Sequence, residues 1–296
     1  SHSILLTVVL TPLLGWLISR VHRRAVTVEK AALFTFLAIG SHLLIDLLTV
    51  YGTQILAPFS DRQFEWGVLF IIDPLFTLPL IAGVLAVAIA RRRPRRAYRF
   101  NLAMLALSIA YLGWSFAAKF HVQDIARKEL ARQGIEYRQI VTLAGPFNTI
   151  LWRVVVMTPD GYAEGWHSLL DSDHAIEFTH HRSAMALLTG LESHWPVARL
   201  QWFTKGFYSV RSEGRDVVIT DLRMGAEGYY AFQFKVGEIG NPQHFTRMVL
   251  FAAVALVFSF LCSIAEAVIL SVSPSTNSPG SISAGSYMLA HGSGTA

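Results

Sequence analysis

The stretch from Leu37 to Gly52, LAIGSHLLIDLLTVYG, places two ionisable side chains inside an apolar run. His42 and Asp46 are four residues apart, so both side chains project from one face of a helix. An aspartate deep in a bilayer costs about 2.5–3.5 kcal/mol on insertion scales, so such a group needs a partner or a function. Two interpretations stay open: a functional site, and an ion pair or hydrogen bond that only orients helices.

The elements that must position these residues are apolar runs. Five runs stand out: Ile4–Ile18, Ala31–Val50, Gly67–Ala90, Phe100–Ala118 and Met248–Leu270. Lipid cannot satisfy backbone polar groups, so runs of this kind are expected to be helices. The fold class that follows is an α-helical polytopic membrane bundle with an extramembrane, β-rich α+β domain. We predict a transmembrane helical domain at 1–119, an extramembrane domain at 120–247, a C-terminal transmembrane helix at 248–270 and a disordered tail at 271–296.

The composition supports a membrane protein with a water-exposed portion. Of the 296 residues, 53% are hydrophobic and only 15% are charged, whereas soluble domains have about 25% charged residues. A single cysteine excludes an internal disulfide and a cysteine-based zinc site. The chain begins without methionine, and we expect it to lack an N-terminal part of the protein.

Basic loops predict the orientation of the bundle. Ser19–Lys30 and Arg91–Arg99 are basic, whereas Tyr51–Trp66 between them is not. By the positive-inside rule the basic loops are cytoplasmic, which places the 120–247 block outside, in the periplasm if the membrane is a bacterial inner membrane. Stop-transfer anchoring explains the arginines better than a nucleic-acid or anionic-lipid patch, so no nucleic-acid partner is expected.

This orientation brings four side chains to one depth. His2, His42, Asp46 and Asp73 all fall near the outer ends of three adjacent spans. Histidine and carboxylate ligands suit zinc, and also manganese or iron. Asp73 has a second interpretation, because a residue before proline is excluded from helical geometry and can cap a helix that begins at Pro74.

The outer block contains several strand candidates and weaker polar candidates. Strands are predicted within Thr149–Thr158, Gly161–Leu170, Arg199–Val210 and Tyr229–Val236. Turns are predicted at Pro159–Gly161 and, in a hairpin, at Glu213–Asp216, and a helix is predicted over His181–His194. The residues of WHSLLDSDH (His167, Asp171, Asp173 and His174) fit a turn better than a metal site. His121 and Asp124 are predicted to be surface residues, and His180 and His181 a solvated cap.

These motifs together resemble a known family. SHS leads an apolar span, followed by GSHLLIDLLTVYGTQILAPFSDRQFEWGVLFIIDPLFTLPL, then FNTILWRVVVMTPDGYAEGWHSLLD and a later DLR. The series resembles the inner-membrane-associated metal-dependent hydrolases, a bacterial family with some members described as LexA-binding. The resemblance extends to about residue 240.

The resemblance implies a multi-pass inner-membrane protein with a divalent-metal site, distantly similar to zinc-dependent phospholipases C and single-strand nucleases. His2 matches the histidine of the family's HS element, His42 and Asp46 match its HxxxD, and Asp73 matches its IDP. The family's further histidine and aspartate elements would precede Ser1, so we expect an incomplete site in this chain.

The resulting hypothesis is a membrane-bound hydrolase that acts on a phosphoester or lipid-linked substrate at the outer leaflet, in contact with membrane lipids. His2, His42, Asp46 and Asp73 would bind a divalent metal, most simply zinc. Asp73 would alternatively orient the attacking water, and Arg62 would hold a phosphate or carboxylate. The alternative is a non-catalytic membrane protein whose outer domain is an interaction module.

Overall fold

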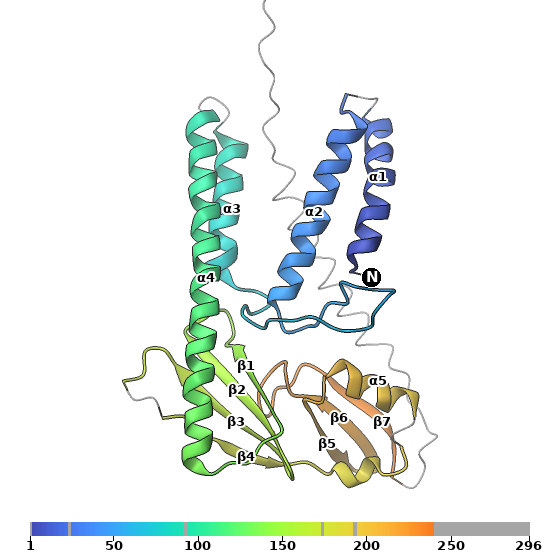
Figure 1. The fold of residues 1–296 in the computed structure, drawn as a ribbon, viewed down its shortest axis with the longest axis vertical. Helices are drawn as coiled ribbons and strands as arrows, with labels where there is room; N and C mark the ends of the chain where they lie inside the picture. The colour runs from blue at the N-terminus through green and yellow to red at the C-terminus, as the bar shows by residue number, and fades with distance from the viewer. Residues whose placement is uncertain (1, 23–24, 91–93, 173–174, 192–193, 240–296) are drawn as a thin grey trace, which may run out of the picture.

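The protein is represented by a computed structural model that describes residues 2–22, 25–90, 94–172, 175–191 and 194–239 (Figure 1). Four α-helices come first along the chain and two antiparallel sheets follow. The predicted fifth apolar run, Met248–Leu270, and the tail after it lie outside the described residues. The helical part and the β-rich part confirm the predicted fold class.

The first two helices, α1 (Ile4–Val21) and α2 (Val28–Leu48), form an antiparallel hairpin. A β-carbon added to Gly15 would lie 2.6 Å from the backbone nitrogen of Ala32. The absence of a side chain at Gly15 therefore allows the two backbones to approach closely, as small residues do in membrane helix pairs. Side-chain caps from Ser3 and Thr27 define where the two helices begin.

The third helix, α3 (Pro74–Ile89), is shorter than the apolar run that predicted it. Residues 67–73 are not helical. In this stretch the Val68 N–H donates to the Leu48 carbonyl over 2.8 Å, at the end of α2. The prediction of a helix over the whole run Gly67–Ala90 is therefore wrong in its first part, because Pro74 favours a helix that begins after Asp73.

The fourth helix, α4 (Pro94–Gln133), runs without interruption for 40 residues. Its first part packs against α3, and its last turns pack against the outer sheet (Figure 1). Val122, Ala126 and Leu130 are completely buried against Trp152 and Val154 of that sheet. The apolar run at Phe100–Ala118 thus ends in the middle of α4. Beyond it the helix packs one face against the outer sheet, so its other face can be polar.

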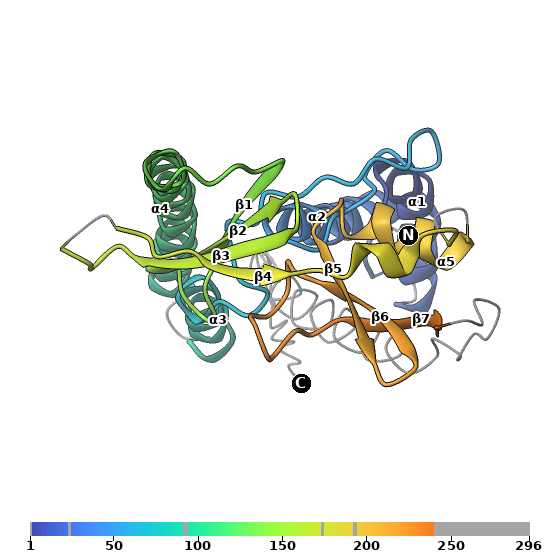
Figure 2. The same ribbon diagram turned by 90° about the horizontal axis from the view of Figure 1, so that it is seen from below.

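Two small antiparallel sheets make up the outer part. The first has the order β1 (Gln139–Ala144), β2 (Leu151–Thr158), β3 (Gly161–Ser168), β4 (Thr179–Arg182). The second has the order β5 (Tyr208–Glu213), β6 (Asp216–Asp221), β7 (Gln233–Glu238). The sheets lie side by side and meet where β4 leads towards β5 (Figure 2). There the Ala184 N–H donates to the Val210 carbonyl over 2.8 Å.

Both predicted hairpin turns are present, but the predicted soluble helix is wrong. Among the described residues of His181–His194, the first two end β4 and the helical ones form a 3-10 turn, η1 (Met185–Leu188). The helix is α5 (Trp195–Phe203), in a segment partly predicted as a strand. Pro196 suits the first helical turn. Val197 and Leu200, three residues apart, are buried against the second sheet, and this tertiary packing decides the helix.

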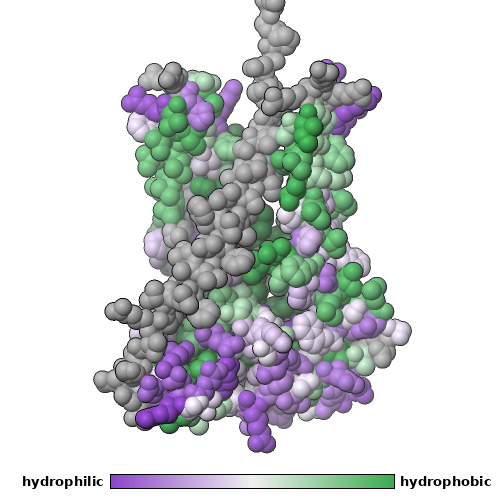
Figure 3. Space-filling view, turned by 180° about the vertical axis from the view of Figure 1, so that it is seen from behind, coloured by the Kyte–Doolittle hydropathy of each residue, from purple (hydrophilic) through white to green (hydrophobic). Residues whose placement is uncertain are grey.

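Apolar and polar side chains lie on different parts of the molecular surface. In Figure 3 hydrophobic side chains cover the helical part, and hydrophilic ones gather over the sheets and at the opposite tips of the helices. Leu13, Leu33 and Leu107 are each more than half exposed on the helices. Among the described helices, α1, α2 and α4 are long and apolar enough to cross a membrane, and α3 is a shorter apolar helix.

Candidate metal centre

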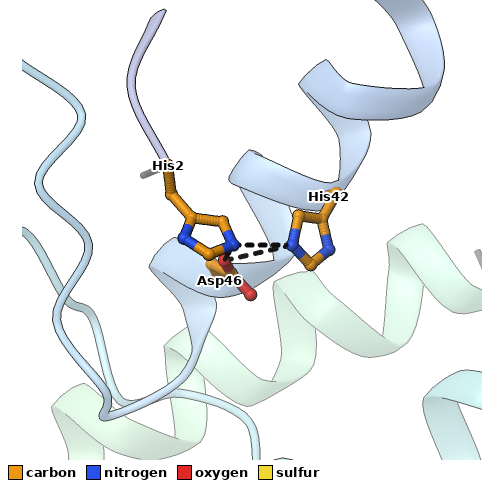
Figure 4. A group of neighbouring side chains, drawn as sticks. All are labelled: His2, His42 and Asp46. Atoms are coloured by element: carbon orange, nitrogen blue, oxygen red, sulfur yellow. Dashed lines mark hydrogen bonds and ion pairs between the residues drawn. The ribbon is translucent and has the colours of Figure 1, made fainter. Parts of the chain in front are cut away.

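Two histidines and one aspartate converge at the end of the helical bundle that faces the sheets (Figures 1 and 4). His42 and Asp46 lie one turn apart in the last two turns of α2, and His2 directly precedes the cap of α1. The His2 Nε2 atom lies 3.1 Å from His42 Nε2. The Asp46 Oδ2 atom lies 3.6 Å from the first nitrogen and 3.5 Å from the second.

These separations suit a shared cation. Ligand atoms bound to one tetrahedral zinc at about 2.0–2.2 Å lie about 3.4 Å from one another. All three separations fall within 0.3 Å of that value. A hydrogen bond accounts for the 3.1 Å contact between the imidazoles, but the carboxylate separations are too long for good hydrogen bonds. The carboxylate separations are within ion-pair distance, and a shared cation would also fit all three separations.

The cluster is accessible from one side. The His42 side chain is 12% exposed, whereas those of His2 and Asp46 are 42% and 30% exposed. Catalytic zinc sites use three protein ligands and keep a further position for water or substrate. Three converging side chains that are partly exposed would suit that arrangement.

Local structure holds His2 against α2. The Ser3 hydroxyl accepts a hydrogen bond from the Leu6 N–H and caps α1. The neighbouring Ile4 N–H donates to the Ile55 carbonyl over 3.0 Å. The loop that supplies this carbonyl is braced by a two-way backbone bridge between Thr53 and Phe64. The loop after α2 therefore holds the start of α1, next to His2, close to the end of α2 that carries His42 and Asp46.

Asp73 does not join the three residues. Its Oδ1 accepts from the Leu75 and Phe76 N–H groups, and its Oδ2 accepts from the Tyr111 hydroxyl over 2.9 Å. The residue is 2% exposed. These contacts correspond to the capping interpretation, and they occupy both carboxylate oxygens.

Arg62 also lies apart from the cluster among the described contacts. Its guanidinium stacks on the Phe64 ring at 5.2 Å, and its backbone N–H donates to the Ser60 hydroxyl. The residue is exposed in the loop after α2. A contact between Arg62 and a bound substrate therefore stays a prediction.

The weaker candidates lie in different surroundings. Asp124 pairs with Lys128 on the exposed face of α4, and His167 is buried in β3. Asp171 accepts from the Ser168 N–H in a turn, and Asp173 and His174 lie outside the described residues. His180 and His181 belong to β4 and do not cap a helix.

Sequence reasoning missed a buried ionic cluster between the outer sheets and the loop after α2. The Arg223 side chain is completely buried and donates to Asp221 over 2.8 Å and to Glu65 over 3.1 Å. Glu65 also pairs with Lys205 at 3.1 Å. The same guanidinium lies 3.5 Å from the carbonyl of Val50, one turn beyond Asp46. The DLR motif was the available signal for this contact.

Comparison with known proteins finds similarity to inner membrane proteins. The family model of the YdjM inner membrane proteins matches residues 1–122, which contain the cluster of His2, His42 and Asp46. The uncharacterized protein YfhP of Bacillus subtilis (strain 168) is 25% identical over 213 residues, or 68% of this chain. The chain spans 60% of the length of that relative. No solved structure matches.

The resemblance to an inner-membrane family is thus confirmed, and the apolar helices agree with it. Residues 1–122 of this chain are thus similar to the YdjM inner membrane proteins.

Proposed function

We propose that this protein is a membrane-bound metal-dependent hydrolase whose metal is held by His2, His42 and Asp46. The observation that carries the proposal is the convergence of one atom from each residue, all within 4.8 Å of one another. When bound, a zinc ion would lower the pKa of a coordinated water towards about 7 and so supply a nucleophile at neutral pH.

The chain's own residues would divide the remaining tasks. His2, His42 and Asp46 would orient the bound ion, and Arg62, on the exposed loop after α2, would contact a phosphate or carboxylate of the substrate. Asp73 keeps its cap and its bond to Tyr111, so the proposal gives it no proton-transfer role.

The substrate class follows from the surroundings of the cluster. Leu5 and Leu44, on the helices that carry the ligands, are 41% and 60% exposed. Exposed apolar side chains at a membrane boundary favour contact with lipid. A phosphoester or lipid-linked substrate would therefore reach the cluster from the outer leaflet.

The proposed topology is multi-pass, with the sheets in the periplasm. The cluster and the sheets lie at one end of the helices. Arg20, in the last turn of α1, and Arg95, in the first turn of α4, belong to the opposite ends of these helices (Figure 1). Basic connections stay in the cytoplasm. In a Cys262→Ala background, Asp171→Cys should react with an impermeant maleimide in intact cells, and Arg96→Cys only after lysis. The reverse labelling would contradict this topology.

Metal analysis of the purified full-length protein tests the site. Wild-type protein should retain about one zinc per chain after dialysis, and His42→Ala should lose most of it, because one of three ligands is removed. His121→Ala, which changes an exposed histidine on α4, is the matched control. Equal metal content in both variants would refute the proposed site.

Hydrolysis of a p-nitrophenyl phosphodiester by the zinc-loaded protein tests the activity separately. Turnover that His42→Ala abolishes and His121→Ala leaves unchanged would support the enzyme. Zinc binding without turnover of phosphoester or lipid-linked substrates would favour the alternative, a non-catalytic membrane protein with an outer interaction domain.

A further inference from the structure

A hollow of about 490 Å³ lies in the outer domain, where β4 of the first sheet meets β5 of the second. Its walls include Tyr162, His181, Arg182, Arg211 and Glu227. Pockets of roughly 300–1,000 Å³ suit small molecules. The hollow lies in the outer domain, apart from His2, His42 and Asp46.

A buried hydrogen-bond chain fixes one wall. Arg153, which is 2% exposed, pairs with Glu164 and donates to the Tyr230 hydroxyl over 3.1 Å. The Tyr230 hydroxyl lies 3.2 Å from that of Tyr162, which in turn donates to Glu227. The tyrosines and Glu227 are thus held by the protein before any ligand arrives, which lowers the cost of binding.

His181 offers a polar atom to this region. Its ring stacks on Tyr162 with a centroid separation of 4.9 Å, and its Nδ1 lies 4.0 Å from Glu227. The Nε2 atom is buried and has no hydrogen-bond partner among the described residues. An unsatisfied buried polar atom costs about 1–3 kcal/mol. The His181 side chain as a whole is 22% exposed and lines the hollow, so a ligand there can contact the ring.

Two arginines and one glutamate line the hollow. Arg211 is engaged by Glu213, Thr220 and Gln233. Within the described chain, no carboxylate lies within ion-pair distance of the neighbouring Arg182 guanidinium. Arg182 is exposed, so water hydrates its charge in the empty hollow, and an anion would replace that water with charge-assisted hydrogen bonds.

We propose that this hollow binds a small molecule through an oxyanion group, phosphate or carboxylate, held by Arg182 and His181. The Glu227 carboxylate, fixed by Tyr162, would accept a hydrogen bond from a hydroxyl elsewhere on the ligand. Binding here is independent of the proposed metal site.

Calorimetric titration of the purified full chain with inorganic phosphate and with succinate tests the site. At least one of these probes should bind, and the more strongly bound one identifies the group that is recognised. Arg182→Gln should weaken binding at least tenfold, since it removes the cation. His181→Asn should weaken it by a smaller factor.

Arg199→Gln is the matched control, because it removes the same charge from exposed α5, away from the hollow. Its affinity should equal that of the wild type. Binding of neither probe, or equal weakening by Arg182→Gln and Arg199→Gln, would overturn the proposal. Arg182 is exposed, so its replacement tests the site even if His181→Asn fails to fold. Zinc content should be unchanged in all three variants.

Discussion

Asp46 and Asp73 lie at the same end of the helical bundle, yet the protein surrounds the two carboxylates in opposite ways (Figure 1). Asp73 is 2% exposed and accepts three hydrogen bonds from fixed donors. Asp46 has a side chain that is 30% exposed and faces two imidazole nitrogens at 3.5 and 3.6 Å. The first arrangement stabilises a helix terminus, and the second leaves room for an ion between the groups.

The outer domain also contains buried charged groups that are surrounded by hydrogen-bond partners, as Asp73 is. Arg153 and Glu164 are both nearly inaccessible, and the arginine also donates to the Leu222 carbonyl and the Tyr230 hydroxyl. A buried charge persists only where its partners are supplied. The comparison therefore predicts that removing members of saturated clusters lowers stability, whereas removing members of the His2 cluster lowers metal affinity.

The largest effect on stability is expected for Arg153→Met. The change leaves Glu164 buried without its cation, which typically costs about 3–5 kcal/mol. Urea unfolding of the purified protein, followed by circular dichroism, measures the loss. Arg153→Met combined with Glu164→Gln should recover part of it, and a single-variant loss below about 1 kcal/mol would contradict the assignment of this cluster to stability.

Alkaline pH should produce the next largest effect. Burial raises the pKa of Tyr230 to about 12, from an ordinary value of about 10. Between pH 10 and 12 the unfolded chain loses this proton while the folded chain keeps it, so Tyr230 contributes a fall in stability of up to about 1.4 kcal/mol per pH unit. Burial also raises the pKa of Tyr162 and Tyr208, which add to the fall. Unfolding titrations at pH 9 to 12 should show this slope, and Tyr230→Phe should reduce it. An unchanged slope in the variant would rule out the buried hydroxyl as its source.

Asp73→Ala should destabilise the protein by about 2 kcal/mol. It removes a helix cap and the acceptor for the Tyr111 hydroxyl. Thermal unfolding in detergent measures the change, and Asp124→Ala, at an exposed ion pair on α4, should stay within about 0.5 kcal/mol of the wild type. Zinc content should not change. A loss of zinc in Asp73→Ala would show that the two aspartates belong to one site.

The smallest effect on stability is expected for Asp46→Asn in the presence of a chelator, below about 1 kcal/mol, because the replacement keeps the shape of the side chain. Added zinc should raise the melting temperature of the wild type, since a ligand that binds the folded state stabilises it. The variant should need at least a tenfold higher zinc concentration for the same rise in melting temperature. An equal response would place the metal elsewhere.

Local sequence predicted the elements that depend on local chemistry. The apolar runs predicted helices because lipid leaves the backbone no alternative, and the turns at Pro159–Gly161 and Glu213–Asp216 follow from their residue types. The sequence predicted a helix over His181–His194 and a strand over part of α5, whereas the structure has the helix at Trp195–Phe203. Short helices are marginal alone, and burial of Val197 and Leu200 decides between them.

The sequence by itself determined that His42 and Asp46 share one helix face, because their spacing matches a helical turn. Only the tertiary structure decided that His2 joins them while Asp73 is occupied by Tyr111. Those contacts join residues 40 and 38 positions apart in the chain. Spacing fixes geometry within one helix, whereas contacts between helices depend on how the helices pack, which no local pattern specifies.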